Sequence, residues 1–526
     1  MSRSPLTTAL RAACGRLAAE DAAHDAQRRR TPEGPSRRGV LRAGLLVGAA
    51  GAAGSALAAD PATAARAGAA AQPRVLVVGA GLAGLCAADV LKRNGITATV
   101  VEAADRVGGR CWTLRGYFAD GQIAERGGEL IDTGHTAIRQ LVQDLRLDTD
   151  NLLAAEPQGS LPLYWFDGAP YTYDQATNDL KAIWQQLKSD VQAASYPTTY
   201  KVSTPRGREL DRMSILEWID LYVPGGRSSK LGQLLDVAYA IEYGADCGKQ
   251  SSLNMLYLLG YSGPGQLRIF GPSNEKFHVR GGNDQIVSAL AARLTGQIKL
   301  GTRLVALARG AGTTWQVTTS SGSRSTTATY DHVVLALPFS LLRDVDLSKA
   351  GFTGVKATAI AQSKMGANTK LQLQFRSRHW NALGGTGDTY ADTGYQSTWE
   401  VSRAQSGASG ILVDYTGGTP ALGFKGATPA ALAQRFLGQI EPVLPGLSAQ
   451  WNGRVSLDDW SAYPWTKGAY SYWGVGDYTA FSGAEGEPVG TCFFAGEHTS
   501  QDFQGYLNGA VETGQRAAAQ VLATLK

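Results

Sequence analysis

The sequence predicts an α/β protein in which a discontinuous, Rossmann-like dinucleotide-binding domain carries an inserted α+β domain. A short apolar strand over 74–78 runs directly into a glycine-rich turn and a helix. A second apolar strand, over 491–495, leads into another glycine-containing turn and the last helix. Between these ends lie a long helical stretch over 174–260 and strands over 298–337. Pieces of a βαβ fold at both ends and near the middle indicate one nucleotide domain interrupted by insertions.

The individual elements follow from apolar periodicity and from glycine and proline breaks. Residues 74–78 are mostly Val and Leu, as in a buried parallel strand. A helical pattern begins at Leu82, continues to about Asn94 and is stopped by Gly95. The other expected elements are strands over 98–101, 298–300, 304–307, 315–319, 333–337, 369–375 and 491–495, and helices over 134–146 and from about Tyr506.

These elements divide the chain into domains. A length of 526 residues is enough for two packed domains. We expect the dinucleotide-binding domain to comprise 73–133, 275–345 and 455–526, the inserted domain with its helical insert to comprise 134–274 and 346–454, residues 1–59 to form a leader, and 60–72 to form a linker.

Composition narrows the class of protein. Hydrophobic residues make up 44% and charged residues 18%, a globular balance. The formal charge is +5, but the basic residues are scattered apart from clusters at 28–30 and 37–38, so we expect no nucleic-acid partner. The five cysteines lack regular spacing and the six histidines form no evident ligand set, so we expect neither a disulfide framework nor a metal site.

The N-terminal segment resembles a twin-arginine signal peptide. Arg37 and Arg38 precede an apolar run over 43–59, and Ala-Leu-Ala at 56–58 offers small residues for cleavage. The run is too short and too weakly hydrophobic to favour a stable membrane span. We expect export by the twin-arginine machinery to the periplasm, the cell surface or the medium. A disordered Ala-rich tail is the alternative interpretation.

The first glycine-rich turn predicts a grip on a dinucleotide. Gly79-Ala-Gly81-Leu82-Ala83-Gly84 follows the strand and opens the helix. Gly79 permits the tight turn, Gly81 lets a pyrophosphate approach the backbone, and Gly84 lets helix and strand pack closely. Leu82 and Ala83 begin the helix, whose N-terminus would face the phosphates.

The residues after the second strand favour FAD over NAD. Glu102 ends that strand, where it and Ala103 should hold an adenosine ribose. Arg106 and the pair Gly109-Arg110 follow closely, which suits a second approach of the backbone to the pyrophosphate with its charge neutralised by arginine.

The C-terminal turn completes the predicted grip. Gly496 and Glu497 close the last strand, and Tyr506 and Leu507 start the last helix. Glu497 could accept hydrogen bonds from ribityl hydroxyls, and the helix N-terminus could face the flavin edge that gains negative charge on reduction.

Taken together, these motifs resemble those of the flavin-containing amine oxidase family, which includes monoamine, polyamine and L-amino acid oxidases. The resemblance is strongest over 73–130, 364–380 and 455–520 and weakest over 150–280. It implies the amine oxidase fold, with FAD-binding and substrate-binding domains. It also implies further FAD-binding residues, namely Gly127, Gly128, Glu129, Leu130 and Val305.

The resemblance places Lys370 near the flavin. In the family, the lysine of this segment hydrogen-bonds to flavin N5, often through water, and is linked to oxygen reactivity. Lys370 lies in a strand over 369–375 that alternates as if half-buried, where it would share a face with Gln372 and Gln374. A lysine that simply faces solvent is the alternative interpretation.

Aromatic residues near the C-terminus match the family's substrate cage. Trp460 and Tyr470 resemble its W…GxY segment, and Tyr470 and Tyr506 match the two cage positions of monoamine oxidases. Trp460 and the two tyrosines therefore join Lys370 as predicted catalytic residues. Ala469 occupies the position of the cysteine that bonds the flavin in monoamine oxidases, so FAD should be non-covalent.

The implied reaction is oxidative deamination of an amine to an imine and then a carbonyl, with O2 reduced to hydrogen peroxide. L-amino acid oxidases resembling this family carry an arginine where this chain has Leu130. Glu129 and Asp132 are acidic instead and should attract a cationic amine, so a primary amine, diamine or polyamine is favoured.

Three alternatives stay open at the level of sequence. The chain could be an L-amino acid oxidase, or its decarboxylating monooxygenase variant, if Arg268 or Arg280 clamps the substrate carboxylate. It could also be a non-catalytic FAD-stabilised binding protein, which the presence of Lys370, Tyr470 and Tyr506 argues against. Assembly as a homodimer is an additional expectation.

Overall fold

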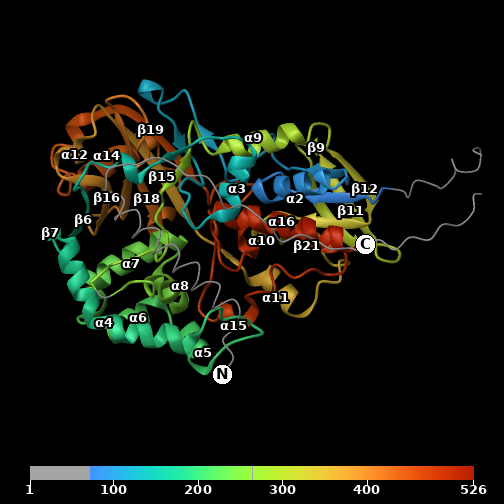
Figure 1. Cartoon of the computed structure of the whole chain (residues 1–526), viewed down its shortest axis with the longest axis horizontal. Helices are drawn as coiled ribbons and strands as arrows, with labels where there is room; N and C mark the ends of the chain where they lie inside the picture. Colours follow the sequence, from blue (N-terminus) through green and yellow to red (C-terminus); the bar gives the residue numbers. More distant parts are fainter. Residues whose placement is uncertain (1–71, 264, 526) are drawn as a thin grey trace, which may run out of the picture. The chain divides into compact units, whose positions relative to one another are not determined.

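The computed structural model describes residues 72–263 and 265–525 (Figure 1). The expected signal peptide over 1–59 and nearly all of the expected linker over 60–72 lie outside the described residues. Within the part that the structure describes, no helix has both the length and the hydropathy needed to cross a membrane.

A five-stranded parallel sheet forms the centre of the nucleotide-binding half. Its strand order is β21-β13-β1-β2-β9, and every neighbouring pair is parallel. The strands are β1 (Val75–Val78), β2 (Ala98–Val101), β9 (Ile298–Lys299), β13 (His332–Leu335) and β21 (Cys492–Phe494). They come from three separate stretches of chain, all within the segments predicted for the dinucleotide-binding domain.

Alternate residues of this sheet face different layers, because side chains alternate along a strand. Val75, Val77 and Val334 belong to a hydrophobic cluster with helices α2 (Leu82–Arg93), α3 (Thr136–Asp144), α9 (Asp284–Arg293) and α16 (Leu507–Ala523). Leu76 and Leu335 belong instead to a cluster that includes β10 (Arg303–Arg309), β11 (Trp315–Ser321) and α11 (Gly354–Gln362). Figure 1 shows α2 and α16 side by side.

A seven-stranded mixed sheet forms the other half. Its order is β19-β15-β18-β17-β16-β6-β7. The strands are β6 (Leu161–Phe166), β7 (Ala169–Tyr171), β15 (Asn368–Phe375), β16 (Gly385–Ala391), β17 (Ser397–Glu400), β18 (Gly410–Gly417) and β19 (Trp451–Asp459). Strand β19 crosses the predicted domain boundary at 455, because it pairs with β15 along most of its length.

The expectation of a half-buried strand over 369–375 is wrong. All eight residues of β15 are buried, since β15 lies between β18 and β19 and both of its faces are covered. Leu371, Leu373 and Phe375 pack in a hydrophobic cluster. On the other face, Gln372 and Gln374 hydrogen-bond to the chain around 119–125.

Helices fill most of the segment between β7 and the return to the parallel sheet. They are α4 (Tyr173–Ala194), α5 (Pro205–Asp211), α6 (Ile215–Tyr222), α7 (Lys230–Tyr243) and α8 (Ser252–Leu259). Thr172 and Ser214 form capping boxes with the third helical residue of α4 and α6, and Pro205 occupies the first turn of α5. Gly244, with a φ of 63°, ends α7.

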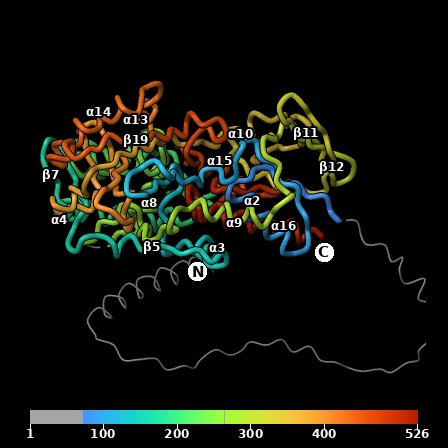
Figure 2. Tube along the Cα trace, turned by 90° about the horizontal axis from the view of Figure 1, so that it is seen from above, coloured from blue at the N-terminus to red at the C-terminus, as the bar shows by residue number. Residues whose placement is uncertain are grey.

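The remaining elements lie outside these two sheets, and β12 pairs with β11 in a three-stranded sheet with β10. They are the strands β3 (Thr113–Leu114), β4 (Ala124–Glu125), β5 (Thr149–Asn151), β8 (Phe277–Val279), β12 (Arg324–Tyr330), β14 (Lys364–Met365) and β20 (Ser471–Tyr472), and the helices α10 (Phe339–Leu342), α12 (His379–Ala382), α13 (Thr419–Leu422), α14 (Pro429–Ile440) and α15 (Asp477–Phe481). Figures 1 and 2 both show β11 and β12 at one end of the described part of the chain and β7 and α4 at the other.

Candidate active site

The turn between β1 and α2 has the shape of a dinucleotide cradle. Gly79 takes a φ of 102°, and a Cβ there would lie 2.6 Å from the carbonyl oxygen of Ala336. A Cβ on Gly84 would overlap the carbonyl oxygen of Gly79. A Cβ on Gly81 would find nothing within 4 Å. Two glycines therefore close the turn, and the third leaves space where a phosphate group can approach the backbone.

Glu102 lies at the end of β2, beside this turn. Its carboxylate accepts hydrogen bonds from the backbone N–H groups of Ala80 at 2.7 Å and Ala104 at 2.8 Å. Burial raises the pKa of the carboxyl, although these hydrogen bonds oppose that shift. Glu102 thus fixes the turn, and contact with a ribose stays a prediction.

Two arginines border the turn. The guanidinium of Arg106 lies 3.8 Å from the ring centroid of Trp112 and donates to the carbonyl of Gly109. Nη1 of Arg110 donates to the carbonyl of Ala469 at 2.8 Å and to Glu497 at 2.7 Å. Arg110 therefore joins the N-terminal glycine-rich region to the C-terminal segment that carries Ala469 and Glu497.

Glu497 is buried and holds the C-terminal turn together. Besides Arg110, its carboxylate accepts from the hydroxyl of Ser471 at 2.7 Å and the N–H of Gly505 at 2.9 Å. Burial alone would raise the pKa of Glu497, but the charge of Arg110 and these hydrogen bonds bring it below its usual range. The backbone N–H of Ser471 donates to it as well, at 3.3 Å, so ribityl hydroxyls would have to share a carboxylate that already has four protein donors.

The segment around Gly127 and Gly128 forms a wall close to the start of α16. A Cβ on Gly128 would lie 2.7 Å from a methyl of Leu507. A Cβ on Gly127 would lie 3.0 Å from the ring of Trp460, whose indole N–H donates to the carbonyl of Arg126 at 2.8 Å. Trp460 therefore supports this backbone wall, and a catalytic role for it stays a prediction.

The other predicted cofactor residues surround the same region. Leu82 and Ala83 are buried in the first turn of α2. Half-buried positions are occupied by Ala103, Leu130 and Val305, and the carbonyl of Val305 accepts from the N–H of Asp346 at 2.9 Å.

Lys370 is buried and paired, so the solvent-facing alternative is excluded. Its ammonium lies 2.6 Å from the carboxylate of Glu129 and donates to the carbonyls of Glu125 and Gly127. The second carboxylate oxygen of Glu129 accepts from the indole of Trp399 at 3.1 Å. Lys370 therefore directs its three N–H donors to protein acceptors, and a water bridge to flavin N5 would have to displace one of them.

Tyr470 and Tyr506, which we call the tyrosine pair, are held by the last turn of α7. The hydroxyl of Tyr470 donates to the carbonyl of Ile241 at 3.0 Å, and that of Tyr506 donates to the carboxylate of Glu242 at 2.9 Å. The hydroxyl of Tyr470 also lies 2.8 Å from that of Tyr415. Burial raises the pKa of both hydroxyls well above their usual value, so each stays a neutral donor.

Comparison with known proteins identifies this architecture. The family model described as flavin containing amine oxidoreductase matches residues 82–522. The chain belongs to this family.

Several relatives share nearly the whole length of this flavin amine oxidoreductase. A Bacillus subtilis (strain 168) protein named as an L-amino-acid oxidase, YobN, is 26% identical over 85% of this chain and 94% of its own. A flavin-containing amine oxidase of Oncorhynchus mykiss is 24% identical over 85% of each chain. Cyclohexylamine oxidase from Brevibacterium oxydans IH-35A has the same fold, with a TM-score of 0.74, 23% identity, and coverage of 86% of this chain and 99% of that one.

FAD is the cofactor of the family, and the residues of this flavin amine oxidoreductase fit it. The turn at Gly79–Gly84 leaves open the one position that a pyrophosphate must approach. Arg106 and Arg110 supply positive charge beside it. The C-terminal turn leads into the N-terminus of α16, which adds the positive end of a helix dipole. Ala469 is buried in the wall, where an alanine methyl can form no thioether to the flavin.

Asp132, which we expected to attract the substrate, is engaged by other parts of the chain. One of its carboxylate oxygens accepts from Ser273 Oγ at 2.9 Å, Asn274 N at 3.0 Å and Glu275 N at 2.7 Å. The other lies 3.2 Å from Nε2 of His135. Asp132 is an anchor for the loop over 273–275, because its acceptors are occupied by that loop and by His135.

The two arginines considered as carboxylate clamps both occupy exposed positions. Arg280 is exposed and pairs with Asp150 at 2.7 Å. Arg268 is exposed as well. The charged groups that most influence Tyr506 are Glu242 and Asp132, and both raise its pKa, as carboxylates do. The surroundings of the tyrosine pair are thus acidic.

Sequence analysis missed Glu242, Trp399 and Tyr415. Trp399 and Tyr415 connect the lysine to the tyrosine pair, with ring centroids 4.8 Å apart. Burial raises the pKa of Glu242 to about 7 despite the hydrogen bond from Tyr506. One signal could have revealed Glu242: an acidic residue in the last turn of a helix opposes the helix dipole, which favours cations there.

Glu275 was missed too, and no sequence signal marks it. It keeps solvent-accessible surface, yet desolvation raises the pKa of its carboxyl well above the usual range, with Asp132 and Glu242 adding to the shift. Glu275 and Glu242 also raise the pKa of Tyr390 and Tyr415.

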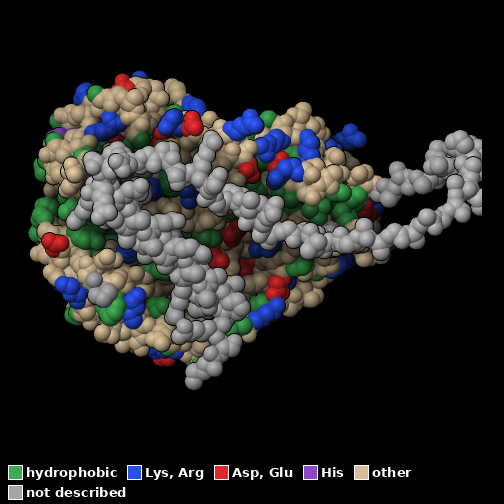
Figure 3. All heavy atoms as spheres, viewed as in Figure 1, with side chains coloured by type: hydrophobic (Ala, Val, Ile, Leu, Met, Phe, Trp, Pro, Cys, Tyr) green, Lys and Arg blue, Asp and Glu red, His purple; other side chains and the backbone are tan. Residues whose placement is uncertain are grey.

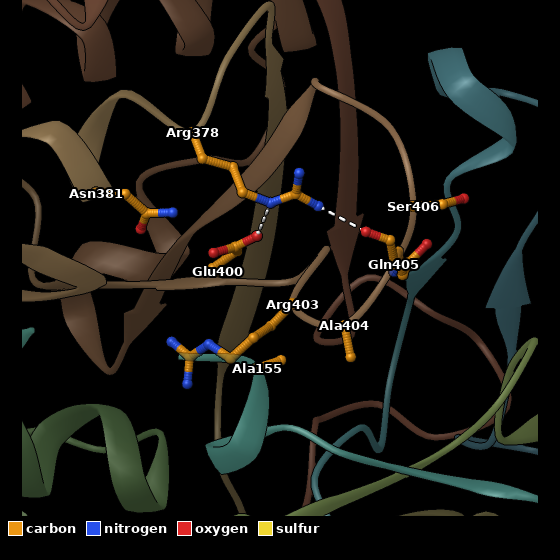
Figure 4. A pocket seen from close by; sticks show the side chains of 8 residues that line it. All are labelled: Ala155, Arg378, Asn381, Glu400, Arg403, Ala404, Gln405 and Ser406. Atoms are coloured by element: carbon orange, nitrogen blue, oxygen red, sulfur yellow. Dashed lines mark hydrogen bonds and ion pairs between the residues drawn. The ribbon is translucent and has the colours of Figure 1, made fainter. Parts of the chain in front are cut away.

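A separate cavity of about 410 Å³ lies beside the loop after β17 (Figure 4). Arg378, Glu400, Arg403 and Gln405 are among its lining residues. Figure 4 shows the guanidinium of Arg378 turned to Glu400 and Gln405, and Arg403 pairs with Glu156 at 2.6 Å. Both guanidinium groups are thus already paired with protein acceptors. The cavity shares no lining residue with the cofactor motifs.

Lysine and arginine side chains are interspersed with acidic and uncharged ones over the visible face (Figure 3). Over residues 72–263 and 265–525, no group of three or more His, Cys, Asp or Glu side chains is arranged to hold a metal ion.

Proposed function

We propose that this FAD-dependent amine oxidoreductase oxidises a primary amine, a diamine or a polyamine. The observation that carries the proposal is the charge around the tyrosine pair. Glu242 hydrogen-bonds to Tyr506 at 2.9 Å, whereas Arg268 and Arg280 are exposed. Carboxylates attract an alkylammonium ion and repel a free carboxylate.

The chain's own residues would bind and orient this substrate. The rings of Tyr470 and Tyr506 are fixed by hydrogen bonds to α7, so they form rigid walls for an amine group. Flavin supplies the redox chemistry, taking two electrons and a hydrogen from the amine's C–H bond and passing them to O2, which gives hydrogen peroxide. Lys370, held by Glu129, would place a positive charge beside the wall at Gly127.

Oxidation of an L-amino acid is the second candidate. It is favoured by the relative named as an L-amino-acid oxidase, which is 26% identical to this chain. It would require a basic residue to reach the substrate carboxylate across the acidic space. Oxidative decarboxylation of an L-amino acid, as by a monooxygenase, would also require a basic residue that reaches the substrate carboxylate.

Anaerobic reduction of the bound flavin separates these functions. The holoenzyme is mixed without oxygen with a panel of monoamines, diamines, polyamines and the common L-amino acids, and loss of the oxidised flavin's visible absorbance is followed. We expect bleaching by amines. Bleaching by amino acids alone would overturn the proposal, and bleaching by no compound would support a non-catalytic FAD protein.

Non-covalent FAD, export and self-assembly complete the proposal. Ala469 supports non-covalent binding, and the twin-arginine pattern at Arg37-Arg38 supports export. A reporter fused after residue 72 and expressed with and without the Arg37-Arg38 pair tests export. Size-exclusion chromatography with light scattering tests the expected homodimer.

A further inference from the structure

His135 is a buried histidine in contact with the tyrosine pair. Only 3% of its surface is exposed. Its ring centroid lies 5.0 Å from that of Tyr506, with the two planes inclined at 60°, and 5.4 Å from that of Phe503, at 87°. Tyr506 and Phe503 belong to one turn, because the N–H of Tyr506 donates to the carbonyl of Phe503 at 3.2 Å. The imidazole therefore contacts the turn that presents one member of the tyrosine pair.

Both ring nitrogens of His135 face Asp132. Nδ1 accepts a hydrogen bond from the backbone N–H of Asp132 at 3.0 Å, so the proton of the neutral ring is on Nε2. Nε2 lies 3.2 Å from Oδ2 of Asp132. Burial lowers the pKa of His135, although the charge of Asp132 opposes that shift. A proton added at Nδ1 would break the bond to the backbone, so these contacts favour one neutral tautomer in one orientation.

Asp132 is itself fixed by a distant part of the chain. Its other oxygen, Oδ1, accepts three hydrogen bonds, which come from Ser273 Oγ, Asn274 N and Glu275 N. Glu275 takes a φ of 48° there, a left-handed conformation that is uncommon for a residue with a Cβ. Because one oxygen of Asp132 holds this loop while the other faces the imidazole, the loop also fixes the side chain that orients His135.

The hydrogen bond of Tyr506 cannot by itself set the plane of its ring. The hydroxyl donates to Glu242 at 2.9 Å. Cβ, Cγ and the hydroxyl oxygen of a tyrosine lie on one line, so rotation about χ2 turns the ring and leaves that oxygen in place. This torsion has a broad, roughly two-fold distribution. Contacts along the ring itself must therefore select its plane, and the imidazole of His135 supplies one.

We propose that His135 is a positioning residue that sets the plane of the Tyr506 ring, and that Asp132 holds His135 in this role. The inference rests on the proposed amine oxidase function, in which Tyr506 orients the amine. An amine that enters as a cation is attracted to the face of an aromatic ring, where the electrostatic potential is negative. A ring turned about χ2 would present its positive edge instead.

Two substitutions separate the ring of His135 from its hydrogen bond. His135→Phe keeps an aromatic ring beside Tyr506 but has no acceptor for the N–H of Asp132. His135→Asn has no ring, but its amide oxygen can accept from that N–H in place of Nδ1.

The assay measures kcat/KM of the holoenzyme variants with the amine of the panel that reduces the parent flavin fastest. His135→Phe should stay close to the parental value. His135→Asn should lower it about tenfold, the order of one desolvated contact between a cation and an aromatic face. The opposite order, with His135→Asn the more active variant, would show that the histidine only anchors the backbone and would overturn the proposal.

Pairing with each tyrosine gives a second readout. Tyr506→Leu removes the ring that His135 orients, so adding His135→Asn should lower kcat/KM no further. In Tyr470→Leu that ring is still present, so adding His135→Asn should again lower kcat/KM about tenfold. Equal losses in both backgrounds would overturn the proposal. His379→Asn is the matched control and should leave kcat/KM unchanged, because His379 lies on α12, with Nε2 2.8 Å from the carbonyl of Pro445.

The outcomes separate this inference from the function it rests on. FAD content and thermal unfolding are measured for each variant. If His135→Asn does not retain FAD, Asp132→Asn replaces it, since it changes the group beside Nε2 and leaves the imidazole in place; a loss of kcat/KM that persists in Tyr506→Leu then overturns the proposal. A parent that oxidises amines while the variants fail these comparisons leaves the amine oxidase function standing. Reduction of the flavin by amino acids alone would overturn both.

Discussion

The strongest prediction concerns two neighbouring glycines in one turn. Gly81 has a φ of −72° and a ψ of 178°, which alanine adopts freely, and its missing Cβ points into space with no atom within 4 Å. Gly81→Ala should therefore fold as the parent does, but its methyl group would stand where the pyrophosphate must approach.

The expected loss of affinity follows from the hydrogen bonds at stake. A hydrogen bond to a charged group contributes about 1.5–3 kcal/mol. Displacing the phosphate from one backbone N–H should thus weaken FAD binding roughly 10- to 150-fold. FAD-free protein is titrated with FAD, followed by quenching of flavin fluorescence, and its thermal unfolding is measured separately.

Gly79→Ala is the matched control, because it should lower the stability of the protein itself, whereas Gly81→Ala should lower only the affinity for FAD. At a φ of 102° its Cβ would lie 2.6 Å from the Ala336 oxygen, so the substitution strains the protein itself. A backbone strain of about 1–3 kcal/mol plus this clash should lower the unfolding temperature of the FAD-free protein. If Gly81→Ala binds FAD as tightly as the parent, or unfolds as early as Gly79→Ala, the assigned role of Gly81 is refuted.

Three further predictions test other parts of the structure. Lys370→Met and Glu129→Gln each leave the other member of the ion pair as an uncompensated buried charge, which lowers the free energy of unfolding by about 3–5 kcal/mol. Their effects on thermal unfolding should therefore be clearly non-additive in the double variant, and simple addition would contradict the buried pair. Burial raises the pKa of Asp414 from 3.8 to about 7, so its stabilising contribution is complete below about pH 4 and is lost as the pH rises through 7. Asp414→Asn should raise the unfolding temperature at pH 8 but not at pH 4, and an equal change at both would rule this out. Acid precipitation should release all the flavin into the supernatant, because Ala469 provides no sulfur for a covalent bond; flavin found in the pellet would contradict this.

The nucleotide-binding half could be predicted from sequence because its determinants are local. The turn at Gly79–Gly84 has a steric requirement at each glycine, and the strand, turn and helix follow one another without interruption. Glu102 and Gly496 lie within a few residues of a strand end, so their positions follow from the strands themselves.

The surroundings of the lysine could not be predicted to the same degree. Whether Lys370 faces solvent depends on β18, β19 and the segment around Glu125, all distant in sequence. The periodicity of β15 alone suggested one covered face, whereas the structure covers both.

The acidic residues show the same dependence on long-range contacts. Asp132 was predicted to face the substrate because it lies near the flavin motif, but the loop at 273–275 occupies its oxygens. That loop includes Glu275, which lies more than 140 residues later in the chain and whose backbone N–H donates to Asp132. No local pattern encodes a left-handed glutamate, since its conformation is imposed by a hydrogen bond from outside its own segment.

The strand order of the parallel sheet has a consequence for the making of the protein. β1 is synthesised first, but its neighbour β13 begins at His332 and the edge strand β21 ends at Phe494. Glu497, which fastens Arg110, follows later still. A nascent chain on the ribosome therefore cannot complete the parallel sheet until β21 has emerged, and the contact with Arg110 must wait for Glu497.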